Sequence, residues 1–418
     1  MFLALAVVVI AGHLVGRLMA AIGQPPVIGE VLSGILLGPS LLGRVAPGFE
    51  EYLFPISARP TLGVVAQLGI VLYMFVVGLE FDAGSLRRRA APFVFTSLAS
   101  IVVPFLLGCG LAVFIYPELS YPSVDHTAFA LFMGVAMSVT AFPVLARILT
   151  DRGLARTEVG VAALTCAAVN DVTAWCLLAV VVGVARATLG GALVSIVLTV
   201  AFMAVMFLVV RPIAARLAGP STRAQGLRGD TEGRGREADE PSQNAVTWTL
   251  AGLLVSALVA EQIGIHAILG AFIFGAILPA DSPVARQLTH NRTPVVTILF
   301  LPAFFALTGL RTEIGLVASG RDWGICLLII VLATAGKFGG TFVAGRLVGM
   351  PSRFAAQLGI LMNTRGLMEL VVLNVGLDLG VISPSLFTMM VIMALVTTAV
   401  TAPLLALFRP GSTGPEAA

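Results

Sequence analysis

The residue with the most unusual chemistry in this chain is Lys337, the single lysine among 418 residues. It lies inside the apolar run ICLLIIVLATAGKFGGTFVAG, and the other basic residues are all arginine. Arginine stays protonated in proteins, whereas a lysine that is removed from water can release its proton. A lysine that only extends its ammonium group to an aqueous interface is the alternative. About 13 apolar or small residues precede Lys337 and about 8 follow it, which favours a functional charge.

The second candidate for chemistry is Asp171, which follows Asn170 in the apolar run VAALTCAAVNDVTAWCLLAVVV. A carboxylate buried in such a segment is costly unless it binds a cation or a proton. Monovalent cations prefer oxygen ligands, and Asp171, the Asn170 amide, Thr140 and carbonyls of unwound backbone could provide them. The alternative is a permanent ion pair between Asp171 and Lys337 that only holds two helices together.

The composition around these residues is that of a polytopic membrane protein. The chain is 58% hydrophobic and 11% charged, against about 25% charged in soluble proteins, and its mean hydropathy is +1.01. The first apolar run, residues 2–21, could be a signal-peptide core, but no basic residue precedes it and many equally apolar runs follow. The four cysteines lack metal-ligand spacing. We therefore expect an all-α protein in a lipid bilayer, with no cofactor and no nucleic-acid partner.

With about 20 residues per span, the apolar runs predict about 13 transmembrane helices. We expect them at Phe2–Ala21, Val27–Leu42, Leu62–Gly78, Phe93–Tyr116, Ala128–Ile148, Val159–Val184, Leu193–Val210, Val246–Glu261, Ile265–Leu278, Pro294–Leu310, Trp323–Gly345, Phe354–Leu377 and Ser385–Phe408.

The arginines predict the orientation of these helices. With thirteen spans and the amino terminus outside, 18 arginines gather at one side of the membrane and five at the other. Because basic loops stay in the cytoplasm, we expect the amino terminus outside and the carboxyl terminus inside, in a bacterial inner or plasma membrane.

One long polar stretch divides the chain. Residues 211–245 are rich in Gly, Arg, Asp and Glu, which predicts a flexible cytoplasmic loop. It separates a first half with a linking helix, residues 1–210, from a second half, residues 246–408, and residues 409–418 would be a short cytoplasmic tail. Six helices, a linking helix and six more helices predict an inverted repeat of the kind found in transporters.

The fifth helix of each half is expected to be interrupted. The first runs FMGVAMSVTAFPVLARIL and the second LGILMNTRGLMELVVLNVG, and each has polar, Pro or Gly residues where it should cross lipid. A simple kink in a packed helix is the alternative for either one alone, but the matched positions favour two unwound segments. The residues assigned to these segments are Ser138, Ala141, Phe142, Pro143, Asn363, Thr364 and Gly366.

Two more charges lie at the second interruption. Arg365 and Glu369 are four residues apart, so they would share one face of a continuous helix and could neutralise each other. Together with Lys337 they are the expected charge-compensating groups, and for this pair we favour a structural role over contact with an ion.

These motifs together resemble one transporter family, the monovalent cation:proton antiporter-2 family. The resemblance rests on QPPVIGEVLSGILLGPSLLG (residues 24–43), the Asn170-Asp171 pair, GIHAILGAFIFG (264–275), GKFGGT around Lys337 and MNTRGLMELVVLNVG (362–376). SVTAFPVLARILT and MNTRGLMEL are most similar to the cation/proton exchanger (CHX) subgroup, and Kef- and NapA-type proteins are more distant relatives.

The resemblance implies a NhaA/NapA-like fold, a homodimer, and a core domain that moves like an elevator against a scaffold. The family's cation-binding aspartate corresponds to Asp171, which would bind K+ or Na+ and protons competitively, and its membrane lysine corresponds to Lys337. Asn170 stands where electrogenic relatives carry a further aspartate, so the stoichiometry stays open. Kef-type relatives have a nucleotide-binding domain, and no glycine fingerprint of such a domain occurs in this sequence.

Other classes of protein fit the residues less well. An intramembrane aspartyl protease needs two facing membrane aspartates, and only Asp171 is available, so we expect no enzyme. A sodium-coupled organic-solute symporter could use crossed broken helices, but it would not need a titratable lysine beside an Asn-Asp pair. The choice between potassium and sodium depends on the size and ligand field of the site, which the sequence does not determine.

Overall fold

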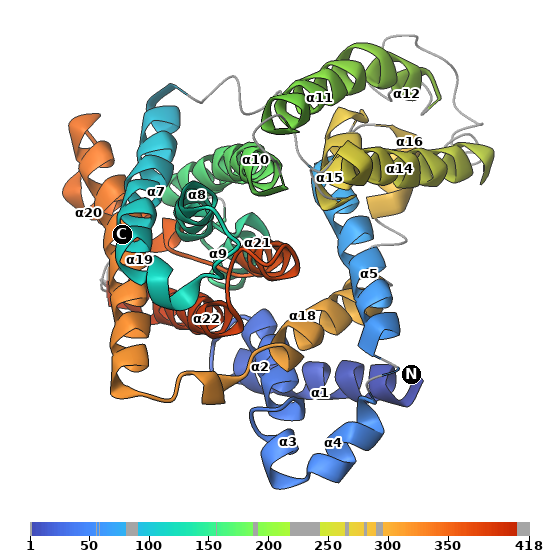
Figure 1. Ribbon diagram of the computed structural model, residues 1–418. Coiled ribbons are helices and arrows are strands. Elements are labelled where there is room, and N and C mark those ends of the chain that lie inside the picture. The colour runs from blue at the N-terminus through green and yellow to red at the C-terminus, as the bar shows by residue number, and fades with distance from the viewer. Residues whose placement is uncertain are drawn as a thin grey trace, which may run out of the picture. The chain divides into compact units, whose positions relative to one another are not determined.

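The computed structural model describes residues 2–55, 57, 59–80, 91–155, 157–186, 191–217, 243–263, 267–279, 282–289 and 296–407. Throughout these ranges every regular element is a helix, which confirms the expected all-α class (Figure 1). The elements before the long polar stretch are α1 (Phe2–Ala21), α2 (Pro26–Leu37), α3 (Leu42–Val45), α4 (Pro47–Leu53), α5 (Arg59–Glu80), α7 (Ala91–Leu119), α8 (His126–Ser138), α9 (Phe142–Asp151), α10 (Glu158–Arg186), α11 (Gly191–Val205), the π-helix η1 (Met206–Val210) and α12 (Arg211–Leu217).

The second part of the chain is also helical. Its elements are α14 (Gln243–Ile263), α15 (Ala267–Ile277), α16 (Pro283–Gln287), the π-helix η3 (Val296–Phe300), α18 (Leu301–Leu310), the short 3-10 helix η4 (Ile314–Leu316), α19 (Gly320–Leu347), α20 (Ser352–Met362), α21 (Leu367–Asp378) and α22 (Pro384–Leu407).

Ten helical segments in the described residues are long and apolar enough to cross a membrane. Three predicted spans are not among these ten. Two of them, Ala128–Ile148 and Phe354–Leu377, are each divided into two shorter helices, α8 with α9 and α20 with α21. The third corresponds to α15, which has 11 residues. The chain is therefore a multi-pass membrane protein, while the count of thirteen spans stays a prediction.

The predicted loop at residues 211–245 begins later than we expected. Arg211–Leu217 is helical as α12, and α14 already starts at Gln243. The apolar helix α11 continues through η1 into α12, so the helix extends into the first polar residues of this stretch. Residues 218–242 and the predicted tail at 409–418 lie outside the described residues.

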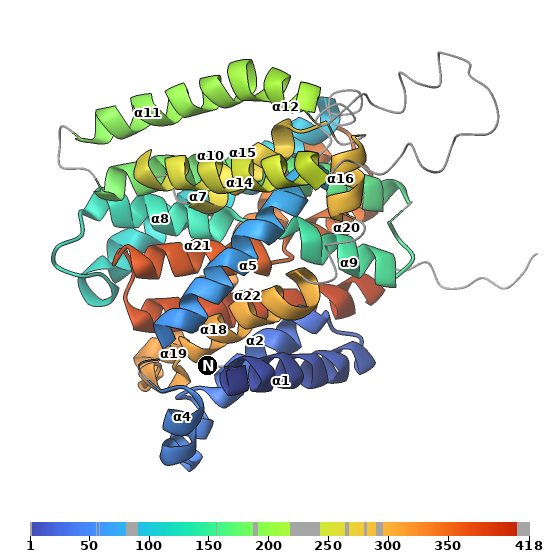
Figure 2. The same ribbon diagram turned by 90° about the vertical axis from the view of Figure 1, so that its right-hand side faces the viewer.

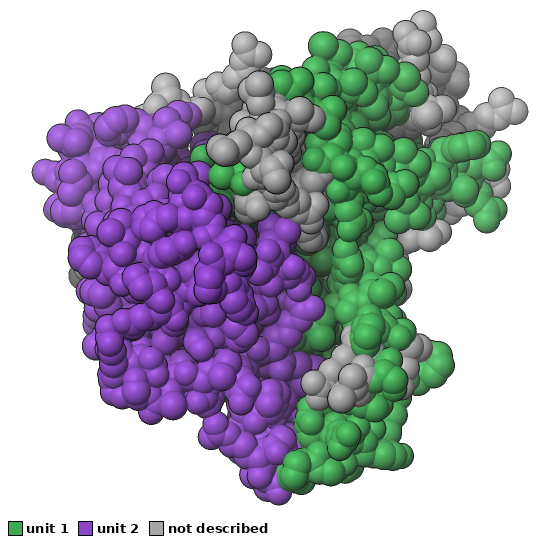
Figure 3. All heavy atoms as spheres, in the orientation of Figure 1, with its two compact units in different colours: residues 1–10, 46–88, 175–307 green, residues 11–45, 89–174, 308–418 purple. Residues whose placement is uncertain are grey.

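The chain forms two compact units, which Figure 3 shows in different colours. Unit 1 contains residues 1–10, 46–88 and 175–307, and unit 2 contains residues 11–45, 89–174 and 308–418. Each unit therefore includes segments from both halves of the sequence.

In unit 1, α5 packs on α15 through glycine (Figure 2). A Cβ atom added to Gly275 would lie 3.0 Å from the Cα atom of Gly78 and would also collide with the Phe75 carbonyl oxygen. Helices in membranes approach closely where small residues face each other, because the hydrophobic effect does not hold them together in lipid.

In unit 2, α7 is packed against α8 and α19. A Cβ atom on Gly108 would lie 2.6 Å from the Met133 carbonyl oxygen on α8, and one on Gly336 would lie 2.9 Å from the Cα atom of Pro104 on α7. Glycine at these two positions lets the helix backbones touch, which places α8 and the middle of α19 close to the same stretch of α7. This stretch positions the candidate site.

Candidate functional site

The first interruption is the short segment between α8 and α9. Helix α8 begins at a capping aspartate, Asp125, and ends at Ser138, and α9 begins at Phe142. The prediction that Ser138, Phe142 and Pro143 are unwound is therefore wrong, whereas Ala141 does lie in the non-helical segment. Pro143 is tolerated in the first turn of α9, because the backbone N–H that proline lacks has no partner within the helix at that position.

The second interruption separates α20 from α21. Helix α20 ends at Met362 and α21 starts at Leu367, so Asn363, Thr364 and Gly366 are non-helical. The backbone N–H groups of Asn363 and Thr364 donate to the Ile360 and Leu361 carbonyl oxygens, over 3.2 and 3.1 Å. These i to i−3 bonds tighten the last turn of α20, and the backbone after it is non-helical.

The two interruptions contact each other directly. The backbone N–H of Ala141 donates to the Thr364 carbonyl oxygen over 3.0 Å. The hydroxyl of Thr140 donates to the Met362 carbonyl oxygen, also over 3.0 Å. Two segments more than 200 residues apart in the chain therefore provide hydrogen-bond partners for each other's backbone. Non-helical backbone inside a membrane protein needs such partners, because lipid offers none.

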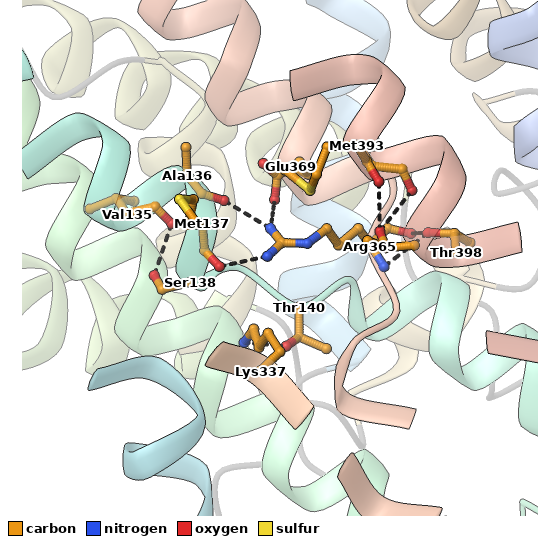
Figure 4. A network of polar contacts seen from close by, with 12 residues as sticks. Val135, Ala136, Met137, Ser138, Thr140, Lys337, Arg365, Glu369, Met393 and Thr398 are labelled. Atoms are coloured by element: carbon orange, nitrogen blue, oxygen red, sulfur yellow. Dashed lines mark hydrogen bonds and ion pairs between the residues drawn. The ribbon is translucent and has the colours of Figure 1, made fainter. Parts of the chain in front are cut away.

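Arg365 joins the second interruption to the end of α8 (Figure 4). Its Nη1 and Nη2 atoms donate to the carbonyl oxygens of Ala136 and Met137 over 3.0 and 2.6 Å. Nη1 also lies 2.6 Å from Glu369 Oε2, and both side chains are fully buried. Because a helix leaves its last carbonyl oxygens without partners, the guanidinium group completes the end of α8.

The backbone of Arg365 is held by Thr398 on α22. The Thr398 hydroxyl donates to the Arg365 carbonyl oxygen over 2.6 Å and accepts from the Arg365 N–H over 3.0 Å. Both polar groups of this non-helical residue are thereby paired, although the residue is buried.

Lys337 is fully buried in the middle of α19. Its Nζ atom donates to the Thr140 hydroxyl over 2.6 Å. A second contact, 3.2 Å from Nζ, is one end of the Asn170 side-chain amide. Because an ammonium group can only donate, the end of the amide that faces it is the oxygen. The lysine is therefore bound by two neutral oxygen atoms.

Asn170 is also held by two serines of α7. In the same amide orientation, its oxygen accepts from Ser100 over 3.0 Å and its nitrogen donates to the Ser97 hydroxyl over 2.9 Å. The Ser97 hydroxyl in turn donates to the Cys166 carbonyl oxygen over 3.0 Å. These contacts fix the side chain of Asn170 toward Lys337 and Thr140.

Asp171 lies next to this network on α10 and is 4% exposed. Its carboxylate accepts from the backbone N–H of Phe142, at the start of α9. Its Oδ1 atom has no hydrogen-bond partner in the described part of the chain. The described residues also contain no ion pair between Asp171 and Lys337, although Asp171, Glu369 and Arg365 all act electrostatically on the lysine. The locking ion pair considered from the sequence is thus not formed.

The structure brings most of the predicted residues together and adds others. Lys337, Thr140 and Asn170 form one hydrogen-bonded group, to which Asp171 is the next residue on α10. The side chains of Asn363 and Thr364 each have an oxygen without a partner among the described residues. Sequence reasoning missed Ser97, Ser100 and Thr398. Hydroxyls spaced within apolar helices were the available signal, but such residues more often bond to their own helix, as Thr401 does to the Thr397 carbonyl oxygen.

The fold and this site define a class of protein. Charged residues buried beside two touching, interrupted helices, in a chain with many apolar spans, are typical of secondary transporters. The chain belongs to the sodium/hydrogen exchanger transmembrane family, whose model matches residues 3–407.

Several relatives are similar over most of this chain. The Na(+)/H(+) antiporter NhaS4 of Synechocystis sp. is 42% identical over 97% of this chain and 96% of its own length. Cation/H(+) antiporter 20 of Arabidopsis thaliana is 38% identical over 97% of this chain, and K(+)/H(+) antiporter 1 of Saccharomyces cerevisiae is 34% identical over 93% of it. The chain spans about half the length of these last two, 48% and 44% respectively.

A solved structure supports the fold. The sodium proton antiporter MjNhaP1 from Methanocaldococcus jannaschii matches with a TM-score of 0.67, covering 96% of this chain and 98% of that one at 15% identity. The resemblance to cation:proton antiporters inferred from the sequence is thus confirmed, and the named relatives are antiporters.

Proposed function

We propose that this protein exchanges a monovalent cation, K+ or Na+, for protons, and that Asp171 binds the cation and the proton in turn. Family membership and antiporter relatives support the exchange of cations for protons. The observation that carries the assignment to Asp171 is its buried carboxylate, which among the described residues has one oxygen without a partner and no ion pair with the nearby lysine. A carboxylate in that state is stabilised by either a cation or a proton, but not by both at once.

Residues close to Asp171 in this network could supply oxygen ligands to a dehydrated monovalent cation. The hydroxyl of Thr140 and the carbonyl oxygens exposed by the interruption that contains it are neutral ligands of the type that such ions prefer. Lys337 competes for the same Thr140 oxygen over 2.6 Å. Arrival of a cation would therefore displace the ammonium group or weaken its hydrogen bond.

The proposed cycle is alternating access of the elevator type. Helices α7–α10 and α19–α22 would form the moving core, and helices from the first three and the eighth to tenth predicted spans would form the scaffold of a homodimer. In this arrangement the amino terminus is outside and the carboxyl terminus is cytoplasmic, in agreement with the distribution of arginine. The organic-solute symporter is not favoured, because the relatives are named antiporters of Na+, K+ or other cations with protons.

The test is cation-driven proton movement in proteoliposomes. A pH gradient is formed, each alkali cation is added separately, and collapse of the gradient is followed with an internal pH dye. We expect collapse with K+ or Na+ in the wild type and a signal equal to that of protein-free liposomes in Asp171→Asn. Asparagine keeps the size and one carbonyl ligand but carries neither charge nor an exchangeable proton.

Glu158→Gln is the matched control, since it neutralises an exposed carboxylate on the same helix. It should retain wild-type exchange. Full cation-driven flux in a folded Asp171→Asn protein would remove Asp171 from the proposed mechanism, and uptake of an organic acid without such flux would favour a symporter.

A further inference from the structure

Beside the ion-binding region, α19, α20 and α22 pack on one another and line two neighbouring hollows, which together we call the groove. At one end of the groove is a hollow of about 470 Å³, lined by Phe342 of α19, Ser352, Arg353 and Ala356 of α20, and Leu407 of α22. Arg353 is exposed and lies at the first turn of α20. This outer hollow combines a fixed cation with apolar walls.

A second hollow continues along the same three helices. It measures about 240 Å³ and is lined by Thr334, Phe338, Ile360, Asn363, Thr401 and Leu404. On each helix its residues lie about one turn further in than those of the outer hollow: Phe338 after Phe342, Ile360 after Ala356, and Leu404 after Leu407. Eight residues of α19, from Phe342 to Thr334, correspond to about 12 Å along the helix axis.

One continuous wall connects the two hollows. The rings of Phe338 and Phe342 are stacked, with centroids 5.8 Å apart and planes inclined by 8°. Phe342 lines the outer hollow and Phe338 the inner one, so the two rings form an apolar path from the level of Arg353 toward the interruption between α20 and α21. An apolar path of this length suits an extended hydrocarbon chain.

The surroundings of the groove are apolar as well. On α19, Val331, Val343 and Leu347 are exposed, and on α22 so are Val400 and Leu407. Since both helices are candidate membrane spans, these side chains are suited to contact with lipid acyl chains. The basic end of the groove lies where the chain leaves α19 and enters α20, between Arg346 and Arg353. This is a loop that the arginine distribution places on the cytoplasmic side.

We propose that this groove, defined by the residues of the two hollows, is a binding site for one anionic phospholipid. The phosphate would lie at Arg353, and one acyl chain would run over Phe342 and Phe338 to the inner hollow. Arginine offers five N–H donors in a fork that matches phosphate oxygens, so it can bind a lipid headgroup while keeping another partner. Basic pockets between transmembrane helices at the cytoplasmic surface bind anionic headgroups for this reason.

The inner hollow lies against a residue of the candidate site, which links such a lipid to that site. Asn363, at its end, is the first non-helical residue after α20, and its Oδ1 atom is unpartnered among the described residues. The next residue, Thr364, accepts the hydrogen bond from Ala141. An acyl chain that fills the inner hollow therefore packs beside residues 363–364, which contact the first interruption.

Lipid retention by the purified full-length protein tests this proposal without any measurement of exchange, so its failure and that of the proposed function are distinguishable. The protein in mild detergent is titrated with palmitoyl-oleoyl phosphatidylglycerol or with the matching phosphatidylcholine, and bound lipids are counted by native mass spectrometry. We expect one phosphatidylglycerol to bind at least tenfold more tightly than phosphatidylcholine. Arg353→Gln should remove this preference.

Arg321→Gln is the control for the headgroup, because Arg321 is an exposed arginine at the opposite end of α19 that pairs with Glu118. It should bind phosphatidylglycerol as the wild type does. Equal retention of the two lipids by the wild type, or an equal loss in Arg321→Gln and Arg353→Gln, would overturn the proposal.

The acyl chain is tested by filling the inner hollow. Thr334→Trp should weaken binding of the long-chain phosphatidylglycerol by about tenfold but leave a dioctanoyl form bound as in the wild type. Leu404→Trp gives a second variant if the first does not fold. Inorganic phosphate serves as the competitor: displacement of the lipid by millimolar phosphate would show that the groove is a phosphate site, and unchanged long-chain binding in folded variants would show that the chain lies elsewhere. Either result contradicts the proposal.

Discussion

Lys337 donates to the hydroxyl of Thr140 over 2.6 Å, and the described residues contain no ion pair between this lysine and Asp171. Its positive charge is thus held by neutral oxygen atoms, within the electrostatic influence of Asp171, Glu369 and Arg365. Two consequences follow. The Asp171 carboxylate keeps an oxygen for another partner, and the Thr140 hydroxyl connects the lysine to the interruption in the first broken helix.

We predict that Thr140→Val lowers both stability and exchange. The valine side chain has a similar shape but no hydroxyl, so it leaves Lys337 Nζ without its shortest hydrogen bond and the Met362 carbonyl oxygen without its donor. An unsatisfied buried polar group costs about 1–3 kcal/mol. Thr140→Ser keeps the hydroxyl and should retain most activity. Thermal unfolding and proteoliposome flux measure the two effects, and equal behaviour of the valine and serine variants would contradict this role.

Variants of Lys337 separate a fixed charge from a proton that is released. If the lysine only supplies positive charge near Asp171, Lys337→Arg should retain exchange, because arginine stays protonated. If proton release from the lysine belongs to the cycle, the arginine variant should be inactive although folded. Lys337→Gln should be less stable than the wild type in both cases, since it removes the positive charge near the buried Asp171 carboxylate. Equal stability and turnover in all three proteins would make Lys337 a bystander.

We predict that the ion pair between Arg365 and Glu369 contributes strongly to the stability of the fold. Glu369→Gln removes the charge that faces Arg365 Nη1 at 2.6 Å, and breaking a fully buried pair costs about 3–5 kcal/mol. Arg365→Gln should cost more, because it also removes the donors to the Ala136 and Met137 carbonyl oxygens. A double variant should lose less stability than the sum of the two single variants. Additive losses in thermal unfolding would mean that the two side chains act separately.

Local sequence signals were sufficient to find the charged residues of the site. Lys337 and Asp171 each interrupt an apolar run, and Pro143 and Gly366 mark the two broken helices. What such signals cannot give is the partner of each charge. The contact of Lys337 with Thr140 in place of Asp171 depends on how α19 is rotated against its neighbours, and close packing such as that of Gly336 on Pro104 of α7 fixes this rotation.

The residues at which the interrupted helices end could not be predicted from the local sequence either. Phe142 and Pro143 are as compatible with a loop as with a first helical turn, and the choice depends on tertiary contacts. Here the Phe142 N–H has the Asp171 carboxylate as its partner, and the Ala141 N–H has the Thr364 carbonyl oxygen. Both partners come from segments that are distant in the chain, so no local pattern could reveal them.

Exchange is predicted to be electroneutral, one cation for one proton. Asp171 carries either species, so the loaded core has the same net charge in both directions as long as Lys337 stays protonated. Asn170, whose amide oxygen faces the lysine at 3.2 Å, cannot ionise. Each net charge that crossed the membrane would contribute about 2.3 kcal/mol per 100 mV, enough to shift the equilibrium ion ratio more than about tenfold. The measurement is the cation gradient at which proton flux reverses, with a membrane potential imposed without potassium.

Asn170→Asp turns this prediction into a comparison between two proteins. The new carboxylate would take the place of the amide oxygen, pair with Lys337, and exchange that pairing for the incoming cation, which frees the lysine to release a second proton. We therefore expect a reversal point that does not move with voltage in the wild type and one that does in Asn170→Asp. Ser97→Ala, which loosens the other end of the Asn170 amide without adding charge, should behave as the wild type. A voltage-dependent reversal point in the wild type would show that Lys337 or another group already carries a second proton.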